Sequence, residues 1–386
     1  MYNRLALPAC GIMLAAGAGL AVSLPASATA DPSHASRVVG HAYIDGNTAG
    51  ANTVAAFDRH ADGSLTEIAG SPFAVGGSGL GTGLGSQGAI QTSPDHRFLL
   101  AVDAGSNEIS VLKVGHGGAL RLVGSPVPSG GVEPVSIAIN GDGLVYVANV
   151  GAGGSNYTGF RLSNKGHLIP LPNTTVAVPD GSGVGDVLFN STGDRLIGTR
   201  DNPSLIDSFT VRPDGRLVPA AGSPFPAQSL GPIGAEFRPT NPNQLYVSNA
   251  HAGAGNGTVS AFSVSRHGVL TPIGDSPVAD FQTAPCWVEI SHDGKYLFAI
   301  NTGSTNLSTY AILSDGSLSL LGSTAFTNGV GAVDARLSPD GRFLSVTGGR
   351  GHVVSTFAVD GGTLTELPSS PVALPASGAP TGLAVI

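Results

Sequence analysis

A unit of four short apolar runs, repeated along the chain, constrains the fold more than any other feature. It is clearest at residues 285–322, where runs at 286–290, 295–301, 307–313 and 317–321 are separated by polar turns. Two of these turns contain Asp-Gly, at residues 293–294 and 315–316. Asp-Gly between β-branched or alternating runs is a strong hairpin signal, because glycine accepts the positive φ that such turns require. Each unit is therefore predicted to be a four-stranded antiparallel sheet.

The unit recurs seven times. The second turn of each copy contains one of the glycines Gly63, Gly118, Gly166, Gly215, Gly268, Gly316 and Gly362. Four strands in a repeat of about 40–50 residues are typical of a β-propeller blade. The first unit lacks a leading strand, whereas residues 380–386 match a leading strand and nothing else. We therefore predict an all-β, seven-bladed β-propeller of four-stranded blades, closed by pairing of residues 380–386 with the N-terminal blade.

The N-terminal segment is predicted to be a signal peptide. Arg4 precedes an apolar run at residues 5–24, and Ala28-Thr29-Ala30 is an A-x-A cleavage site. We expect residues 1–30 to be removed and residues 31–386 to form one secreted, extracytoplasmic domain. No later run is apolar over the ~18 residues that a membrane span needs. Cys286 is then the only cysteine left, which excludes an internal disulfide.

Charge and composition exclude some classes of partner. The chain has 26 acidic and 18 basic side chains, and removal of Arg4 with the signal peptide makes it more acidic still. Nucleic acid and anionic membranes both require basic surface, so neither is an expected partner. The 57 glycines and 27 prolines accompany a 41% hydrophobic content, which favours many turns between short strands over disorder.

The propeller topology assigns residues to its two faces. The first strand of each blade is innermost, and both hairpin turns of a blade lie on one face. The starts of first strands and the ends of second strands surround the channel mouth on the other face, where loops are expected to carry the site. These loops are residues 45–51, 103–107, 149–156, 200–204, 249–256, 301–306 and 348–352. The glycine-rich residues 76–85 are interpreted as a linker between blades, because no helix follows as in a phosphate-binding loop.

Histidines are too dispersed for a transition-metal centre. Most lie in or beside hairpin turns of the far face, and only His251 and His352 fall on the mouth loops. Copper and zinc sites need several converging His or Cys ligands. No resident metal or cofactor is therefore expected, with calcium kept as an alternative.

Carboxylates near the channel are the candidates for chemistry. Four first strands carry one each, in comparable places: Asp186, Glu236, Glu289 and Asp334. They could act as general acids and bases, or hold Ca²⁺ together with the asparagines at second-strand ends, Asn149, Asn249 and Asn301. The alternative is that they line a water-filled channel and pair with Arg200 or Arg336.

Three units resemble the lactonase family of seven-bladed propellers, which includes 6-phosphogluconolactonases and carboxymuconate cyclases. These are SPDHRFLLAVDAGSNEISVLKV, SHDGKYLFAINTGSTNLSTYAILSDGSLSLL and SPDGRFLSVTGGRGHVVSTFAVDGGTLTEL. NTVAAFDRHADGSLTE, GLGSQGAI and Pro285-Cys286-Trp287 resemble, more narrowly, its secreted actinobacterial branch. The chain departs from the phosphogluconolactonases at Gly88, Ser136 and Leu188, where they carry histidine, and at Cys286, where they carry arginine.

The resemblance implies hydrolysis of a lactone at the channel mouth. Glu236 or Asp186 is the expected base, Arg200 would polarise the carbonyl and His251 would assist. The expected ligand-binding residues are Asn149, Asn249, Glu289, Asn301, Asp334 and Arg336. A non-catalytic propeller is the alternative. The expected partner is a lactone or carbohydrate-like molecule, or an extracellular protein, bound by a monomer.

Overall fold

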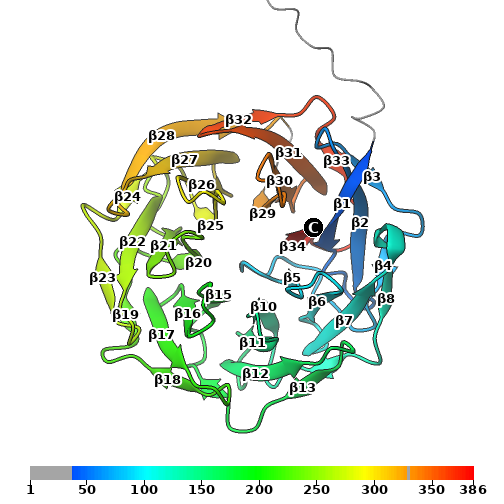
Figure 1. Cartoon of the computed structure of the whole chain (residues 1–386), viewed down its shortest axis with the longest axis horizontal. Coiled ribbons are helices and arrows are strands. Elements are labelled where there is room, and N and C mark those ends of the chain that lie inside the picture. The colour runs from blue at the N-terminus through cyan, green and yellow to red at the C-terminus, as the bar shows by residue number, and fades with distance from the viewer. Residues whose placement is uncertain (1–36, 328–330) are drawn as a thin grey trace, which may run out of the picture.

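Seven β-sheets form a ring around a central channel (Figure 1). This computed structural model describes residues 37–327 and 331–386, so the predicted signal peptide lies outside the described residues. Within those two ranges no helix has the length and hydropathy of a membrane span. The prediction of an all-β propeller with seven blades is confirmed.

Each blade is one sheet, and its successive strands lie farther and farther from the channel (Figure 1). In this order the blades are β34 (Thr381–Val385), β1 (Val38–Asp45), β2 (Thr53–His60), β3 (Leu65–Glu67); β5 (Ile90–Thr92), β6 (Phe98–Asp103), β7 (Glu108–Val114), β8 (Leu120–Leu122); β10 (Pro134–Ile139), β11 (Leu144–Asn149), β12 (Asn156–Leu162), β13 (Leu168–Pro170); β15 (Val184–Phe189), β16 (Arg195–Arg200), β17 (Leu205–Val211), β18 (Leu217–Pro219); β20 (Pro232–Phe237), β21 (Gln244–Asn249), β22 (Thr258–Val264), β23 (Leu270–Pro272); β25 (Pro285–Ile290), β26 (Tyr296–Asn301), β27 (Asn306–Ile312), β28 (Leu318–Ala325); β29 (Ala332–Leu337), β30 (Phe343–Gly348), β31 (Val353–Asp360), β32 (Thr363–Glu366).

Six of the seven sheets also hold a two-residue strand that the sequence analysis did not predict. It pairs with the third strand of its own blade after the fourth strand has ended. These strands are β4 (Phe73–Ala74), β9 (Val127–Pro128), β14 (Val176–Ala177), β19 (Phe225–Pro226), β24 (Val278–Ala279) and β33 (Val372–Ala373). A 3₁₀ turn, η1 (His116–Gly118), lies between β7 and β8.

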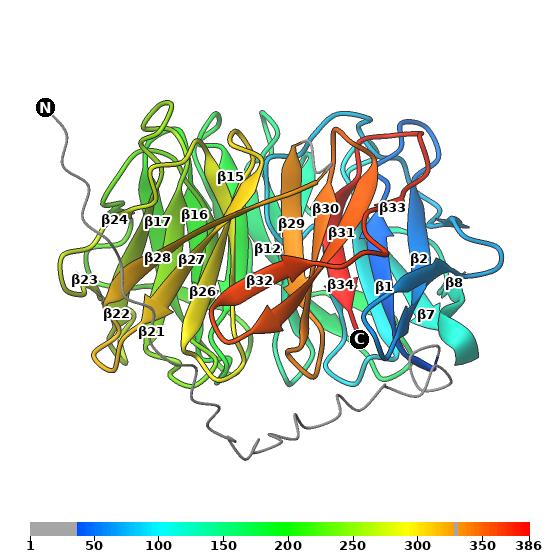
Figure 2. The ribbon, with the colours of Figure 1, turned by 90° about the horizontal axis from the view of Figure 1, so that it is seen from above.

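The C-terminal strand closes the ring. β34 pairs antiparallel with β1, with Tyr43 opposite Ala384 and Ile44 opposite Leu383. The side view in Figure 2 places β34 beside β1, next to the blade of β29–β32. The last strand of the chain thus completes the first blade, as predicted, and the ring has no open edge between its two ends.

The hairpin turns and the packing between blades follow from the repeat. Gly294 and Gly316 have φ of 68° and 91°, the left-handed backbone predicted for the Asp-Gly turns. Apolar side chains from neighbouring sheets pack face to face; Phe98 of one blade shares a cluster with Ile137 and Val145 of the next. Gly166 is needed at such a contact, because a Cβ there would lie 2.4 Å from the Phe98 ring.

Candidate functional site

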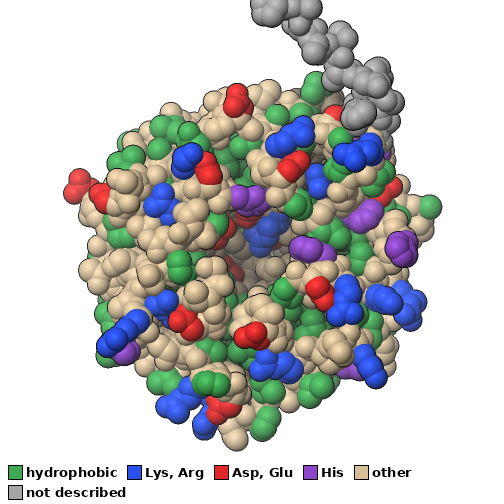
Figure 3. Space-filling model, in the orientation of Figure 1, with side chains coloured by type: hydrophobic (Ala, Val, Ile, Leu, Met, Phe, Trp, Pro, Cys, Tyr) green, Lys and Arg blue, Asp and Glu red, His purple; other side chains and the backbone are tan. Residues whose placement is uncertain are grey.

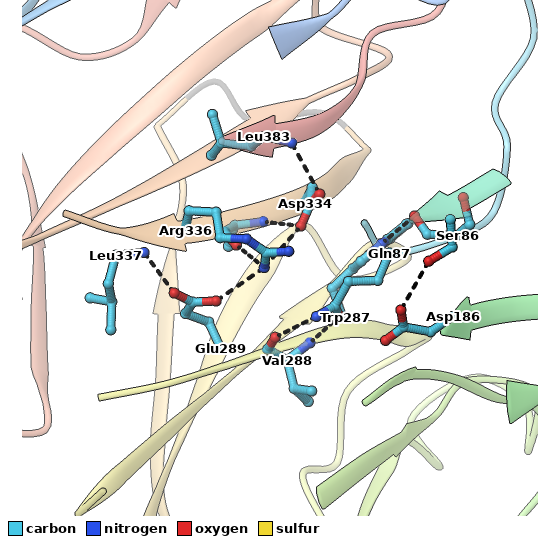
Figure 4. A network of polar contacts seen from close by, with 12 residues as sticks. Ser86, Gln87, Asp186, Trp287, Val288, Glu289, Asp334, Arg336, Leu337 and Leu383 are labelled. Carbon is cyan, nitrogen blue, oxygen red and sulfur yellow. Dashed lines mark hydrogen bonds and ion pairs between the residues drawn. The ribbon is translucent and has the colours of Figure 1, made fainter. Parts of the chain in front are cut away.

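Ser86 and Gln87, here called the crossing pair, extend from the glycine-rich segment across the channel. The Gln87 amide exchanges two hydrogen bonds with the backbone of Val288, both 3.2 Å long (Figure 4). The Gln87 backbone N–H donates to Gly185 O at 2.9 Å. Ser86 Oγ donates to Val135 O, and Ser86 O accepts from the Trp287 indole. The segment that leads into β5 is thereby bonded to the first strands of three other blades, at Val135, Gly185 and Trp287–Val288.

Two cavities lie at opposite ends of the channel and share no lining residue. The carboxylate cavity, of about 360 Å³, is lined by the turn-side halves of first strands and includes Asp186, Glu236, Glu289, Arg336, Gln87 and Gln91. The mouth cavity, of about 520 Å³, is lined by Asp201, His251, Trp287, Arg350, His352 and apolar neighbours. Gln87 lines the carboxylate cavity. Its hydrogen-bond partner Val288 follows directly on Trp287, which lines the mouth cavity, so the crossing pair lies between the two cavities.

Arg336 is the cation of the carboxylate cavity. Its Nη1 lies 3.1 Å from Glu289 Oε2 and 3.7 Å from Asp334 Oδ1 (Figure 4). Glu289 Oε1 also accepts from the Leu337 N–H, and Asp334 Oδ2 from the Leu383 N–H. Surrounding carboxylates raise the pKa of Arg336 against the effect of burial, so the guanidinium stays charged. The central hollow of the face drawn in Figure 3 contains acidic and basic side chains, as this cluster requires.

Asp186 and Asp334 hold their protons more tightly than exposed aspartates. Burial raises the pKa of Asp186 to about 7, although the Ala235 N–H donates to its Oδ2 and Ser136 Oγ donates to its Oδ1. Burial likewise raises the pKa of Asp334 to about 6, and the nearby Arg336 opposes that rise. Several carboxylates around one arginine cannot all ionise without strong repulsion. The cluster therefore retains protons near neutral pH.

Glu236 is the carboxylate with spare hydrogen-bonding capacity. Its Oε2 is buried and has no hydrogen-bond partner within residues 37–327 and 331–386. Burial raises the pKa of Glu236 well above its ordinary value, the charge of Glu289 raises it further, and Arg336 lowers it. An unpartnered buried carboxylate oxygen facing a cavity is suited to accept a proton from a bound water or hydroxyl.

The four predicted catalytic residues do not converge. Asp186 and Glu236 line the carboxylate cavity, whereas His251 lines the mouth cavity. Arg200 lines neither cavity; its Nη2 pairs with Asp207, whose other oxygen accepts from the Tyr157 hydroxyl at 2.9 Å. The expected cooperation of Glu236 with Arg200 and His251 therefore does not match the structure. Glu236 is the fifth residue of β20 and lies about 13 Å along the strand from its start at the mouth, and Arg200 is paired inside its own blade.

The predicted ligand-binding residues divide in the same way. Glu289, Asp334 and Arg336 form the ionic cluster, but the three asparagines are fully buried inside their own blades. Each donates from Nδ2 to the start of the next strand: Asn149 to Asn156, Asn249 to Ser260, and Asn301 to Asn306. The asparagine amides therefore lie apart from the carboxylates, and the two groups do not form the calcium site considered from the sequence. No group of three or more His, Cys, Asp or Glu side chains within the described ranges is arranged to hold a metal ion.

The site residues predicted from the sequence did not include Gln87 and Gln91 of one cavity or Asp201 and Arg350 of the other, although Asp201 was recognised as an ionisable group near the mouth. Gln87 follows directly on a segment interpreted as a linker, and its partner Val288 is 201 residues away. The only local signal for Asp201 and Arg350 was their position on or beside the mouth loops, at the ends of second strands.

The comparisons agree with the fold. The sequence matches the family described as "Lactonase, 7-bladed beta-propeller" over residues 42–196 and 237–372. No curated protein sequence matches the chain. Similar solved structures include a candidate 6-phosphogluconolactonase from Bacteroides fragilis, with TM-score 0.73 and 20% identity over 90% of this chain and 98% of that one. A periplasmic gluconolactonase from Pseudomonas aeruginosa has TM-score 0.70 and 21% identity over 90% and 99%.

Proposed function

Because the chain belongs to the lactonase family of seven-bladed β-propellers, we propose that it hydrolyses a lactone bound in the carboxylate cavity. The observation that carries the proposal is the unpartnered carboxylate oxygen of Glu236 in a cavity that also holds the Arg336 guanidinium. A general base and a fixed cation are the two groups that water-dependent opening of a lactone requires.

Glu236 acts as the base in this proposal. Its ionised carboxylate removes a proton from water, whose oxygen attacks the lactone carbonyl carbon. The carbonyl oxygen gains negative charge in the tetrahedral intermediate, and Arg336 stabilises that charge. The ring C–O bond then breaks, and protonated Glu236 returns its proton to the departing alkoxide. The product is the open hydroxy acid, and Glu236 is again ionised.

Arg336 replaces Arg200 in the role of polarising the carbonyl. Within the described ranges, the hydrogen bonds and ion pairs of Arg336 all use Nη1. Nη2 and Nε therefore remain for a ligand oxygen, whereas the Arg200 guanidinium is buried against Asp207. Glu289 and Asp334 hold Arg336 in place, so the cation needs little reorganisation when charge develops on the substrate.

The substrate class follows from the lining. About 360 Å³ suits a ligand of monosaccharide size, and the amide of Gln91 offers hydrogen bonds to hydroxyl groups. We therefore propose a sugar lactone or a similar hydroxylated cyclic ester. The neighbour from Pseudomonas aeruginosa, described as a periplasmic gluconolactonase, and the N-terminal sequence both support an extracytoplasmic location.

A non-catalytic binding propeller is the second candidate. This alternative is favoured by the hydrogen bonds of Asp186, Glu289 and Asp334, because each of these carboxylates already accepts one from a backbone N–H. Such a propeller would hold its ligand by the same lining without turning it over.

Hydrolysis of a panel of sugar and aliphatic lactones, followed by pH-stat, separates the two candidates. We expect turnover by the wild type and a loss of about 10²–10⁴-fold in kcat for Glu236→Gln. The exposed Glu67→Gln is the matched control and should keep full activity. Binding of a lactone without turnover would favour the non-catalytic propeller and overturn the proposed hydrolase.

A further inference from the structure

The mouth cavity is separated from the carboxylate cavity by the crossing pair and has a different chemical character. Its wall includes the apolar side chains of Ile233, Trp287, Val333 and Pro380. The Trp287 ring is anchored by the 2.7 Å hydrogen bond from its indole N–H to Ser86 O. An apolar cavity of about 520 Å³ with a few polar groups is the usual form of a small-molecule site.

Three of the polar side chains that line the mouth cavity are basic residues: His251, Arg350 and His352. Arg350 lines it and has no hydrogen bond or ion pair with any residue of the described ranges. His352 Nδ1 lies 3.2 Å from Pro375 O, and since a carbonyl only accepts, Nδ1 carries the proton and donates. His251 lies close enough to Asp201 to lower the pKa of that carboxyl against the effect of burial.

Asp201 is the one carboxylate among the residues that line this cavity. Burial raises the pKa of Asp201, and its buried Oδ1 has no hydrogen-bond partner within the described residues. Asp201 is thus one acidic group among three basic side chains of this lining, His251, Arg350 and His352. The carboxylate cavity has the opposite balance, with several acids around one arginine.

Large apolar side chains are exposed on two loops that precede strands lining the mouth cavity. Leu230 and Phe281 are 58% and 72% exposed on the loops that lead into β20 and β25, the strands that carry Ile233 and Trp287. The Leu230 carbonyl accepts from the His251 N–H at 3.0 Å. Phe281 has φ of 59°, a left-handed conformation that is uncommon for a bulky residue. Leu230 thus lies next to His251 of the cavity lining, and an exposed apolar side chain beside a cavity is typical of a ligand-binding surface.

We propose that the mouth cavity is a second ligand site, which binds a small organic anion with an apolar, aromatic body. The apolar body packs against Trp287 and Ile233, and the anionic group pairs with Arg350. Arginine is suited to this role, because its planar guanidinium donates two parallel hydrogen bonds to a carboxylate or sulfonate. This site is independent of the proposed hydrolysis, since it shares no lining residue with the carboxylate cavity.

Trp287 is the only tryptophan of the chain and lines this cavity, so quenching of its fluorescence detects binding here, and the variants below distinguish this cavity from the carboxylate cavity. The test is a titration with 1-anilinonaphthalene-8-sulfonate, an aromatic anion that accepts energy from tryptophan. We expect saturable quenching of Trp287 at one site per chain, weakened about tenfold by Arg350→Gln through loss of one charge-assisted interaction. The matched control is Arg121→Gln, an exposed arginine on the outer strand β8, which should leave the affinity unchanged.

Two further experiments distinguish a specific anion-binding site from nonspecific adsorption of the dye to apolar surface. Uncharged N-phenyl-1-naphthylamine should bind equally to the wild type and to Arg350→Gln. Glu236→Gln and an excess of glucono-δ-lactone should leave the dye titration unchanged, because they act on the other cavity. The proposal is overturned if Trp287 fluorescence does not saturate, if Arg350→Gln and Arg121→Gln bind the dye equally, or if the lactone displaces it.

Discussion

Replacing Asp186 by asparagine should make the free energy of unfolding fall less as the pH rises. Asp186 is buried and accepts hydrogen bonds from Ser136 Oγ and the Ala235 N–H. Asparagine preserves this arrangement: its carbonyl oxygen accepts from Ala235, and its amide donates to the Ser136 hydroxyl, which can rotate to accept. The substitution therefore removes the titratable proton and leaves the geometry unchanged.

The size of the effect follows from the raised pKa of Asp186, about 7 in the folded protein against an ordinary value of 3.8. The folded state keeps the proton over a pH range in which the unfolded state releases it. The stabilising contribution is therefore fully present below pH ~3.8 and is lost as pH rises through ~7. A tenfold change in a proton affinity is worth about 1.4 kcal/mol, so the total is roughly 4 kcal/mol. The asparagine variant has no such dependence.

Urea unfolding at pH 4 and pH 8 measures this difference. The free energy of unfolding of Asp186→Asn, relative to wild type, should rise by about 3–4 kcal/mol between the two pH values. The exposed Asp360→Asn is the control and should show no comparable change. An equal difference between Asp186→Asn and wild type at both pH values would refute the inference that this buried carboxyl holds a proton near neutral pH.

Four further outcomes are expected. Arg200→Met should reduce the free energy of unfolding by about 3–5 kcal/mol in urea titrations, because it strands Asp207 as a buried charge, yet leave kcat of the folded fraction intact. Gln87→Ala should cost about 2–4 kcal/mol by the same assay, since the Val288 N–H and carbonyl lose their partner. Deletion of Thr381–Val385 should abolish cooperative thermal unfolding, because β1 then becomes an open edge at the channel. In pH-rate profiles, kcat/KM should rise with pH through a range above that of an ordinary glutamate, because Glu236 must ionise to act as a base.

The sequence predicted the fold because its signals are local and repeated. The Asp-Gly turns at Gly294 and Gly316 set the hairpins, and the lone strand at the C-terminus had no place except the incomplete first blade. A seven-fold repeat leaves few alternatives to a closed ring. The short fifth strands, such as β4, carry no comparable pattern and were not predicted.

The candidate site was predicted only in part, for physical reasons that differ between residues. Pairing of the carboxylates with Arg336 was anticipated and is observed at Glu289 and Asp334. The distance of Glu236 from the channel mouth could have been predicted from its place as the fifth residue of β20, because a strand rises about 3.3 Å per residue. Gly198 pairs with Asp207, so Asp207 is diagonal to Arg200 across one hairpin, a contact that strand register can predict. Gln87 meets Val288 only after the ring has closed, and no local pattern encodes that contact.

The most direct test of the account compares kcat/KM of Glu236→Gln and His251→Gln on the first lactone that the wild type hydrolyses. We expect a loss of at least about 100-fold for Glu236→Gln and a change of less than about twofold for His251→Gln, because Glu236 lines the carboxylate cavity and His251 does not. Full activity in Glu236→Gln together with a large loss in His251→Gln would place the chemistry in the mouth cavity and contradict the account.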